Sequence, residues 1–134
     1  MVKSNKTISF PGSSTICLAL EVSTANLNLV KDGLRAVISE GIARVVFRGQ
    51  TIEICGKTGT AQERNDRPNH AVFVSFAPYQ KPEVVVNVVI PFGYSSGNAA
   101  ALANKVYNYY YGFDTFEQII TRNSDNIKSI NVSD

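Results

Sequence analysis

The chain has 134 residues, of which 44% are hydrophobic and 18% are charged, and its formal net charge is +2. This length suggests one domain or part of one, and it is enough to bury a hydrophobic core. The scattered charges argue against a nucleic-acid surface. We find neither a transmembrane run nor a signal peptide, so we expect no membrane anchor in these residues.

The cysteines and the histidine favour structural roles. Cys17 and Cys55 are too few for a disulfide framework, and the chain has one histidine and no Cys-x-x-Cys spacing. A zinc site therefore has almost no support, and we expect neither a metal nor another cofactor. Cys55 lies in an apolar stretch, which favours a small buried hydrophobic residue.

The N-terminal third predicts one helix. Residues 1–14 are polar and read as a loop, and residues 15–22 are apolar but too short to distinguish a strand from a loop. Apolar residues then recur at helical spacing over residues 25–40, after Ser23 and Thr24 as candidate N-caps. Gly41 fits the position where a left-handed residue ends a helix.

The middle of the chain predicts four strands. Residues 42–48 and 51–60 are rich in β-forming residues on either side of a Gly-Gln turn, which is typical of a hairpin. After a polar loop at 61–70, residues 71–77 form another strand. Residues 84–90 are almost continuously apolar, so we expect a strand inside a sheet that is covered on both faces.

Two helices are predicted towards the C-terminus. The first spans residues 99–111 and is stopped by Gly112. Its apolar side is expected to contain Leu102, Ala103, Val106, Tyr107 and Tyr110. Asp114-Thr115-Phe116-Glu117 resembles a capping box before a short helix, and residues 122–134 form a polar tail. Consecutive strands with short links predict an α+β fold, in which helices pack on an antiparallel sheet.

The segment with the clearest chemistry is Gly56-Lys57-Thr58-Gly59-Thr60-Ala61-Gln62. A Lys-Thr-Gly triplet entering a strand is one of three motifs that build a penicillin-reactive serine site. Lys57 can attract an anionic substrate, and the hydroxyls of Thr58 and Thr60 can donate to a carboxylate. Gly59 has no Cβ, so a ligand can approach the strand closely. On an edge strand the Thr60 N–H would be free, and a peptide could bind as an added strand.

The other two motifs are absent from the positions that this chemistry requires. No lysine in the chain has a serine three residues before it, so there is no Ser-x-x-K nucleophile. Ser124-Asp125-Asn126 and Ser96-Gly97-Asn98 spell the remaining Ser-x-Asn element, but both follow Lys57, whereas that element should precede it. We interpret both as coincidences and expect the isolated chain to be catalytically inactive. The triplet alone is common and also fits ordinary turn chemistry.

The stretch from about residue 29 to residue 111 resembles the C-terminal part of the transpeptidase domain of class B penicillin-binding proteins, of the elongation type that includes penicillin-binding protein 2. The matching segments keep the family's order and cover residues 30–34, 41–43, 56–62, 70–78 and 82–90. Val72 replaces a frequent Trp and Cys55 a usual Ala. The resemblance implies the β-lactamase/transpeptidase-like fold, with α/β/α layers, over residues 1–112. Residues 113–134 would form a short helix and tail.

By this resemblance, the whole protein would be a membrane-anchored D,D-transpeptidase on the extracytoplasmic face of the bacterial cytoplasmic membrane. A serine elsewhere in it would attack the D-Ala-D-Ala bond of a peptidoglycan stem peptide, and β-lactams would acylate the same serine. Lys57 would join the proton and charge network. Thr58, Gly59 and Thr60 would bind the substrate, and the Thr60 N–H would form half of the oxyanion hole. Gln62 would line the same strand further along.

Two alternatives remain open on the sequence. The chain could be a piece of a related β-lactamase or β-lactam sensor, or a non-catalytic module that binds stem peptides or partner proteins. If it is a fragment, surfaces meant for its other half would be exposed, which favours self-association.

Overall fold

The structure, a computed structural model, describes residues 22–121 of the chain. In this range it contains three helices and three strands, namely α1 (Thr24–Ser39), β1 (Cys55–Ala61), β2 (His70–Ala77), β3 (Val84–Ile90), α2 (Ser96–Tyr110) and α3 (Phe116–Thr121). The loop expected at residues 1–14, most of the apolar stretch at 15–22 and the tail at 122–134 lie outside the described residues.

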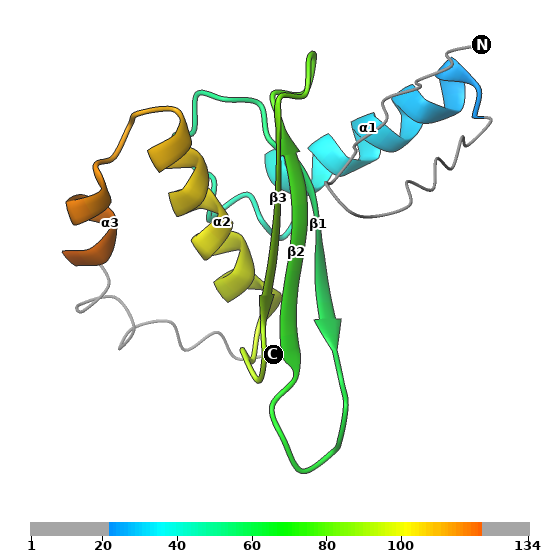
Figure 1. The fold of residues 1–134 in the computed structure, drawn as a ribbon. Helices are drawn as coiled ribbons and strands as arrows, with labels where there is room; N and C mark the ends of the chain where they lie inside the picture. The colour runs from blue at the N-terminus through cyan, green and yellow to red at the C-terminus, as the bar shows by residue number, and fades with distance from the viewer. Residues whose placement is uncertain (1–21, 122–134) are drawn as a thin grey trace, which may run out of the picture.

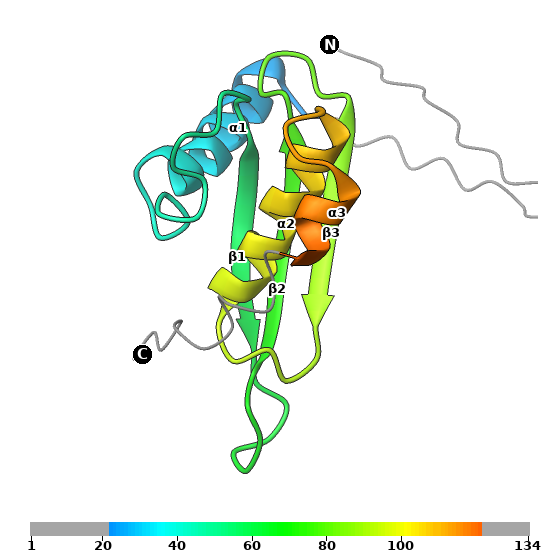
Figure 2. The ribbon, with the colours of Figure 1, turned by 90° about the vertical axis from the view of Figure 1, so that its left-hand side faces the viewer.

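The three strands form one antiparallel sheet in the order β1-β2-β3. Figures 1 and 2 show α2 and α3 on one face of this sheet and α1 on the other, near one end of β1. We call the face beneath α2 the inner face and the opposite one the outer face. The expected α+β fold with α/β/α layers is therefore confirmed.

The hydrophobic core lies between the inner face and α2. Side chains alternate along β2, so Ala71, Phe73, Ser75 and Ala77 are buried on the inner face. The buried side of α2 consists of Ala99, Ala100, Ala103 and Tyr107. The stripe predicted for this helix is wrong at three positions, because Leu102, Val106 and Tyr110 are exposed. The alanines let the helix approach the sheet, which the bulkier stripe would not.

Tyr107 connects the helix to the middle of the sheet by hydrogen bonds. Its hydroxyl donates to Ser75 Oγ at 2.9 Å, and the Ser75 hydroxyl donates to the Val86 carbonyl at 3.1 Å. Both side chains are almost completely buried. This chain of polar groups satisfies the two buried hydroxyls and links α2, β2 and β3.

Residues 42–48 do not form the predicted strand. The Phe47 N–H donates to the Ala43 carbonyl at 3.3 Å and the Val46 N–H donates to the same carbonyl at 3.0 Å, which are the spacings of helical turns. Ala43, Val46 and Phe47 face the core, whereas Ile42 and Val45 are 78% and 72% exposed. The apolar residues that matter therefore recur at i, i+3 and i+4, and packing on the inner face overrides their β propensity.

Helix α1 confirms the predicted helix within one residue at each end, and Ser23 caps it by accepting from the Asn26 N–H. Gly41 follows the C-cap residue Glu40, but its backbone is not left-handed, so that part of the prediction is wrong. A Cβ at Gly41 would instead lie 2.9 Å from the Val37 carbonyl oxygen. Close approach to α1, rather than a positive φ, requires glycine here.

Three charged side chains of α1 hold the helix against the end of the sheet. Arg35 donates to the Ile54 carbonyl at 3.1 Å, Asp32 accepts from the Tyr79 hydroxyl, and the Lys31 ammonium lies 4.9 Å from the centre of the Tyr79 ring. The hydrogen bond to Asp32 raises the pKa of Tyr79 above its usual value. These contacts position the segment that leads into β1.

The ends of the C-terminal helices follow the rules used in the prediction, with small shifts. Helix α2 begins at Ser96, three residues earlier than expected, with Ser95 as its cap. Gly112 adopts a φ of 74° after the helix ends, as expected for a glycine stop. The capping box forms one residue later than predicted, between Thr115 and Gln118, whose side chains each bond the other's backbone N–H.

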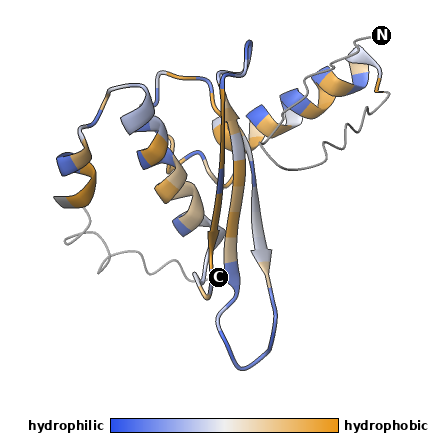
Figure 3. Ribbon diagram, in the orientation of Figure 1, coloured by the Kyte–Doolittle hydropathy of each residue, from blue (hydrophilic) through white to orange (hydrophobic). Residues whose placement is uncertain are grey.

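Strand β3 has exactly the predicted bounds, but the prediction that both its faces are covered is wrong for the described residues. Val86 and Val88 are buried on the inner face, whereas Val85 and Val89 on the outer face are 70% and 58% exposed. Figure 3 shows that β2 and β3 are mainly apolar, whereas the loop between β1 and β2 is polar. Within residues 22–121, α1 is the only element on the outer face, and the apolar residues on the rest of that face are exposed.

Replacing Tyr107 by Phe is expected to lower the free energy of unfolding by about 1 kcal/mol at neutral pH, because a buried hydrogen bond is lost. Burial raises the pKa of Tyr107 to about 12, whereas an unfolded tyrosine ionises near about pH 10. This contribution to stability is therefore complete below about pH 10 and is lost as the pH rises towards about 12. The difference in unfolding free energy between wild type and Tyr107→Phe should therefore decrease over that pH range.

Denaturant unfolding at about pH 8 and about pH 11, on either side of the usual tyrosine pKa, measures both free energies. Tyr109→Phe is the matched control, because Tyr109 is more than half exposed and its ring still contacts Phe116 after the substitution. A difference for Tyr107→Phe that is the same at both pH values would contradict this account.

Candidate functional site

Strand β1, which carries the Lys-Thr-Gly triplet, is an edge strand among the described residues. It pairs with β2 on one side, with Lys57 opposite Val74 and Thr60 opposite Ala71, and the other side has no strand neighbour. This edge is free because residues 42–48 turn helically on the inner face instead of pairing with β1. The predicted free Thr60 N–H and the binding of a peptide as an added strand both required β1 to be an edge strand, and this condition is met.

The four predicted residues that lie on β1 are adjacent but do not share a face. Strand alternation places Lys57 and Gly59 on the outer face with Val74 and Val72. Thr58 and Thr60 lie on the inner face. A ligand that contacts both sets must therefore lie along the free edge of β1 rather than on either face.

Lys57 is exposed, and its ammonium donates to the Thr58 carbonyl at 2.7 Å. In a strand, the backbone groups of residues two apart point in the same direction. The Thr60 N–H therefore points towards the side from which Lys57 reaches the Thr58 carbonyl. A cationic side chain and a backbone donor are thus available to the same ligand.

The two glycines of this strand have different surroundings. A Cβ on Gly56 would lie 2.7 Å from Phe73 Cζ and 3.0 Å from Ser75 Cβ, so this position has no room for a side chain. A Cβ on Gly59 would meet Val72 Cβ at 3.5 Å, an ordinary contact. Gly56 therefore serves packing, and Gly59 leaves open the approach to the strand.

Cys55, at the start of the strand, is completely buried, which confirms the structural role predicted for it. Burial raises the pKa of its thiol, so the group stays protonated and unreactive near neutral pH. Among residues 22–121, no cluster of three or more His, Cys, Asp or Glu side chains could hold a metal ion.

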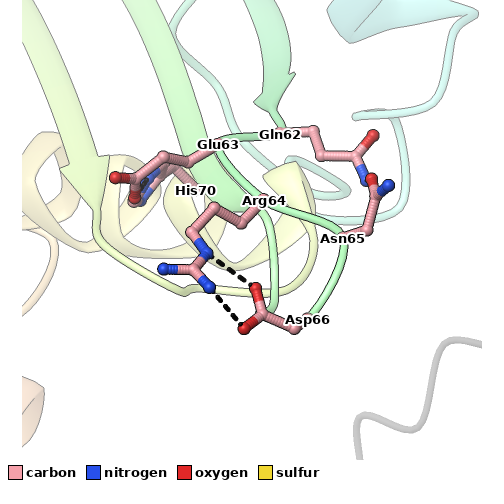
Figure 4. Close-up of polar contacts among 6 residues, drawn as sticks. All are labelled: Gln62, Glu63, Arg64, Asn65, Asp66 and His70. Atoms are coloured by element: carbon pink, nitrogen blue, oxygen red, sulfur yellow. Dashed lines mark hydrogen bonds and ion pairs between the residues drawn. The ribbon is translucent and has the colours of Figure 1, made fainter.

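Gln62 lies one residue beyond the end of β1, at the start of the loop that joins β1 to β2 (Figure 4). Its side chain donates to Asn65 Oδ1 at 2.8 Å. Further along the loop, Arg64 makes a two-pronged pair with Asp66, with both N–O distances at 2.9 Å. The pair is exposed, so it contributes little to stability and mainly shapes the loop.

His70 is a residue whose contacts the sequence did not predict. Its Nδ1 accepts from the Phe92 N–H at 3.2 Å, and its Nε2 lies 3.2 Å from Glu63 Oε2. The sequence provided one signal, since this histidine begins the segment 70–78 that resembles a family motif. Its partners could not be found because they belong to two different loops.

A groove of about 610 Å³ lies on the inner side, between α2, α3 and residues 42–46, and Thr58 contributes to its wall. Most of its lining is apolar, and Ala43, Val46 and Ala100 are among the residues that form it. Lys57 and Gly59 face the opposite side of the sheet. The groove and the free edge of β1 are therefore two distinct features that meet at Thr58.

Residues 15–108 match the family model of the penicillin-binding protein transpeptidase domain. The chain belongs to this family. The match includes all five predicted site residues and every element described above except α3 and the end of α2. The resemblance first suggested by the Lys-Thr-Gly segment is therefore confirmed.

Relatives and solved structures agree with this membership. The transpeptidase-family chain is 36% identical over 97 residues to the peptidoglycan D,D-transpeptidase MrdA of Haemophilus influenzae, covering 60% of this chain and 15% of the relative. The structure of Pseudomonas aeruginosa PBP2 in complex with WCK 5153 is 36% identical, with a TM-score of 0.60, and the match covers 72% of this chain and 21% of that one.

A third match is the imipenem acyl-enzyme complex of penicillin-binding protein A from Mycobacterium tuberculosis. It is 25% identical, has a TM-score of 0.57, and covers 78% of this chain and 25% of that one. The transpeptidase-family chain thus spans a quarter or less of the length of each of these relatives. It corresponds to a fragment of the transpeptidase domain.

Two substitutions test the different surroundings of Gly56, which is tightly packed, and Gly59, which has room for a side chain. Gly56→Ala is expected to cost about 1–3 kcal/mol of unfolding free energy, because the new methyl group overpacks the sheet against Phe73. Gly59→Ala should change stability by no more than about 0.5 kcal/mol, because its Cβ has room. Urea unfolding measures both, and equal losses for the two variants would contradict the assignment.

Proposed function

We propose that this chain supplies the Lys-Thr-Gly strand of a peptidoglycan D,D-transpeptidase, which cross-links stem peptides through a serine acyl-enzyme and is acylated by β-lactams. The observation that carries the proposal is the free edge of β1, where the Lys57 ammonium and the Thr60 N–H point to the same side. The names of the relatives, a D,D-transpeptidase and an imipenem acyl-enzyme among them, support it.

The residues of β1 have distinct roles in this proposal. A D-Ala-D-Ala stem peptide or a β-lactam lies antiparallel or parallel to the free edge, with its carboxylate near the hydroxyls of Thr58 and Thr60. The Lys57 ammonium lowers the pKa of nearby proton-transfer groups, because it disfavours a second positive charge and favours a negative one, and so assists proton transfer to and from the serine. The Thr60 N–H donates to the oxyanion that forms in the transition state. Gly59 allows the close approach, and Gln62 binds the substrate further along.

The chain alone lacks the nucleophile, because none of its lysines follows a serine at the required spacing. We therefore place the serine and its lysine in the remainder of the transpeptidase domain. Residues 1–112 would belong to that domain, and residues 113–134 would form a short helix and a polar tail. None of the helices in residues 22–121 is long and apolar enough to cross a membrane. The whole protein would be anchored in the bacterial cytoplasmic membrane with this domain outside it.

The remainder of the domain would cover the outer face of the sheet. This face presents Val74, Val85 and Val89 to solvent, and α1 also exposes Leu27 and Val30. An apolar surface of this kind on an edge-containing sheet favours association. We propose that the isolated chain self-associates through it, and that the complementary part of the domain replaces these contacts.

A non-catalytic module that binds stem peptides is the second candidate, because the free edge of β1 suits peptide binding without any nucleophile. The two candidates differ in one respect. The fragment needs a complementary part that carries Ser-x-x-K, whereas the module binds peptide alone.

Incubating the chain with a penicillin and measuring its intact mass is expected to give no covalent adduct. When the chain is joined in one polypeptide to a segment that carries the Ser-x-x-K and Ser-x-Asn motifs, one adduct per polypeptide should form. Lys57→Ala should slow this acylation by about 100-fold or more, in the range seen for losing a proton-transfer group. Lys81→Ala removes an exposed charge in the turn before β3 and should have no effect.

Size-exclusion chromatography of the same samples checks the outer face. The chain alone should elute as oligomers, and the joined polypeptide as a monomer. An adduct on the chain alone would place a reactive serine within these residues. A joined polypeptide that folds as a monomer but is never acylated would contradict the transpeptidase proposal.

A further inference from the structure

The loop between β1 and β2 and the turn after β3 come together at His70. Residues 62–69 form the loop, and residues 91–95 form the turn. The Phe92 N–H donates to His70 Nδ1 at 3.2 Å, and the Tyr94 N–H donates to the Asn69 carbonyl at 3.1 Å. Two hydrogen bonds from alternate residues of the turn therefore reach consecutive residues at the start of β2.

The turn at residues 91–95 has an unusual backbone that these bonds help to hold. Phe92 has a φ of 53° and Tyr94 a φ of 62°, values that side-chain-bearing residues rarely adopt. Between them, a Cβ on Gly93 would lie 2.9 Å from both Ala71 Cβ and Ile90 Cβ, so the turn is pressed against the sheet. A conformation of this kind persists only where surrounding contacts impose it.

The other side of the His70 ring reaches the loop that continues β1. His70 Nε2 lies 3.2 Å from Glu63 Oε2, the ring of His70 lies 5.0 Å from that of Phe92, and the Arg67 guanidinium lies 5.6 Å from the centre of the Phe92 ring. Figure 4 shows Glu63 beside His70, while Gln62 points away towards Asn65. On β1, Ala61 is the residue paired with His70. Glu63 and Arg67 are thus the charged groups that the described residues place at this cluster.

These contacts determine which nitrogen carries the proton. Nδ1 accepts from a backbone N–H, so it must be unprotonated, and the proton of the neutral ring lies on Nε2 and is donated to Glu63. We propose that His70, Glu63 and Phe92 form a clamp. In this clamp the neutral histidine is a positioning residue for the C-terminal end of β1. By fixing Glu63, the clamp holds the loop that begins at Gln62, two residues after Thr60.

Protonation of His70 opens one half of the clamp, because a ring with two N–H groups cannot accept from Phe92. The Glu63 contact remains and becomes an ion pair. This inference rests on the proposed function only in its consequence, that loosening the clamp slows acylation at β1.

His70 is the single histidine in the chain, so a sample labelled with ¹⁵N-histidine gives the two ring-nitrogen signals of one imidazole. For the neutral ring we expect the Nε2–H tautomer, because Nδ1 accepts from the Phe92 N–H. Hydrogen exchange at the Phe92 amide should be about tenfold faster in His70→Leu than in wild type, the order of magnitude for losing one hydrogen bond. His70→Gln can still accept from Phe92 and donate to Glu63, so it should restore slow exchange.

The Glu63 half of the clamp is tested by Glu63→Ala, with Glu40→Ala as the control. Glu63 is exposed in a loop, so its loss does not threaten folding. Glu40 is the C-cap residue of α1, and that helix ends near the opposite end of the sheet (Figure 1). In the joined transpeptidase polypeptide, Glu63→Ala should slow acylation several-fold and Glu40→Ala should not.

An Nδ1–H tautomer, or equal Phe92 exchange in His70→Leu and His70→Gln, would overturn the clamp. These measurements need no penicillin, so they stand or fall separately from the proposed function. If the tautomer and exchange results are as expected but Glu63→Ala leaves acylation unchanged, the clamp exists and its positioning role is refuted.

Discussion

The free edge of β1 is the constraint on which the rest of this structure depends. A strand that is hydrogen bonded on one side has backbone donors and acceptors left for another partner. Here those groups lie beside the exposed Lys57, on a strand whose inner side is fixed by Gly56 against Phe73. The edge stays free because residues 42–48 pack as helical turns on the inner face, and Arg35 of α1 holds the segment that leads into β1.

The two faces of the sheet differ in a way that fits a piece of a larger domain. The inner face is complete, with alanines of α2 close to β2 and with Tyr107 and Ser75 satisfying each other's hydroxyls. The outer face has α1 at one end and exposed valines along the rest. Matches that cover a quarter or less of each relative lead to the same conclusion. The chain therefore corresponds to part of a larger transpeptidase domain.

The sequence was most informative where a residue type has a single local meaning. Ser23 as a candidate cap, Gly112 as a helix stop and the apolar run in 84–90 each predicted an element end or type within about one residue. The sequence also identified the segment 56–62 through its motif. It could not predict the turns at 42–48, because Val45, Val46 and Phe47 have high β propensity and only the inner face selects their helical spacing. The contacts of His70 were equally hidden, since Glu63 and Phe92 are joined to it only by the fold.

The central claim is that the backbone of β1, and not only its side chains, serves the reaction. Thr60→Pro in the joined transpeptidase polypeptide tests it most directly, because proline removes the N–H and is tolerated on an edge strand whose N–H faces away from its neighbour. Thr60→Val keeps the N–H and removes the hydroxyl. The account predicts that Thr60→Pro slows penicillin acylation by about 100- to 1,000-fold, the cost of losing one oxyanion donor, and that Thr60→Val slows it less. An acylation rate for Thr60→Pro equal to that of the wild type would contradict it.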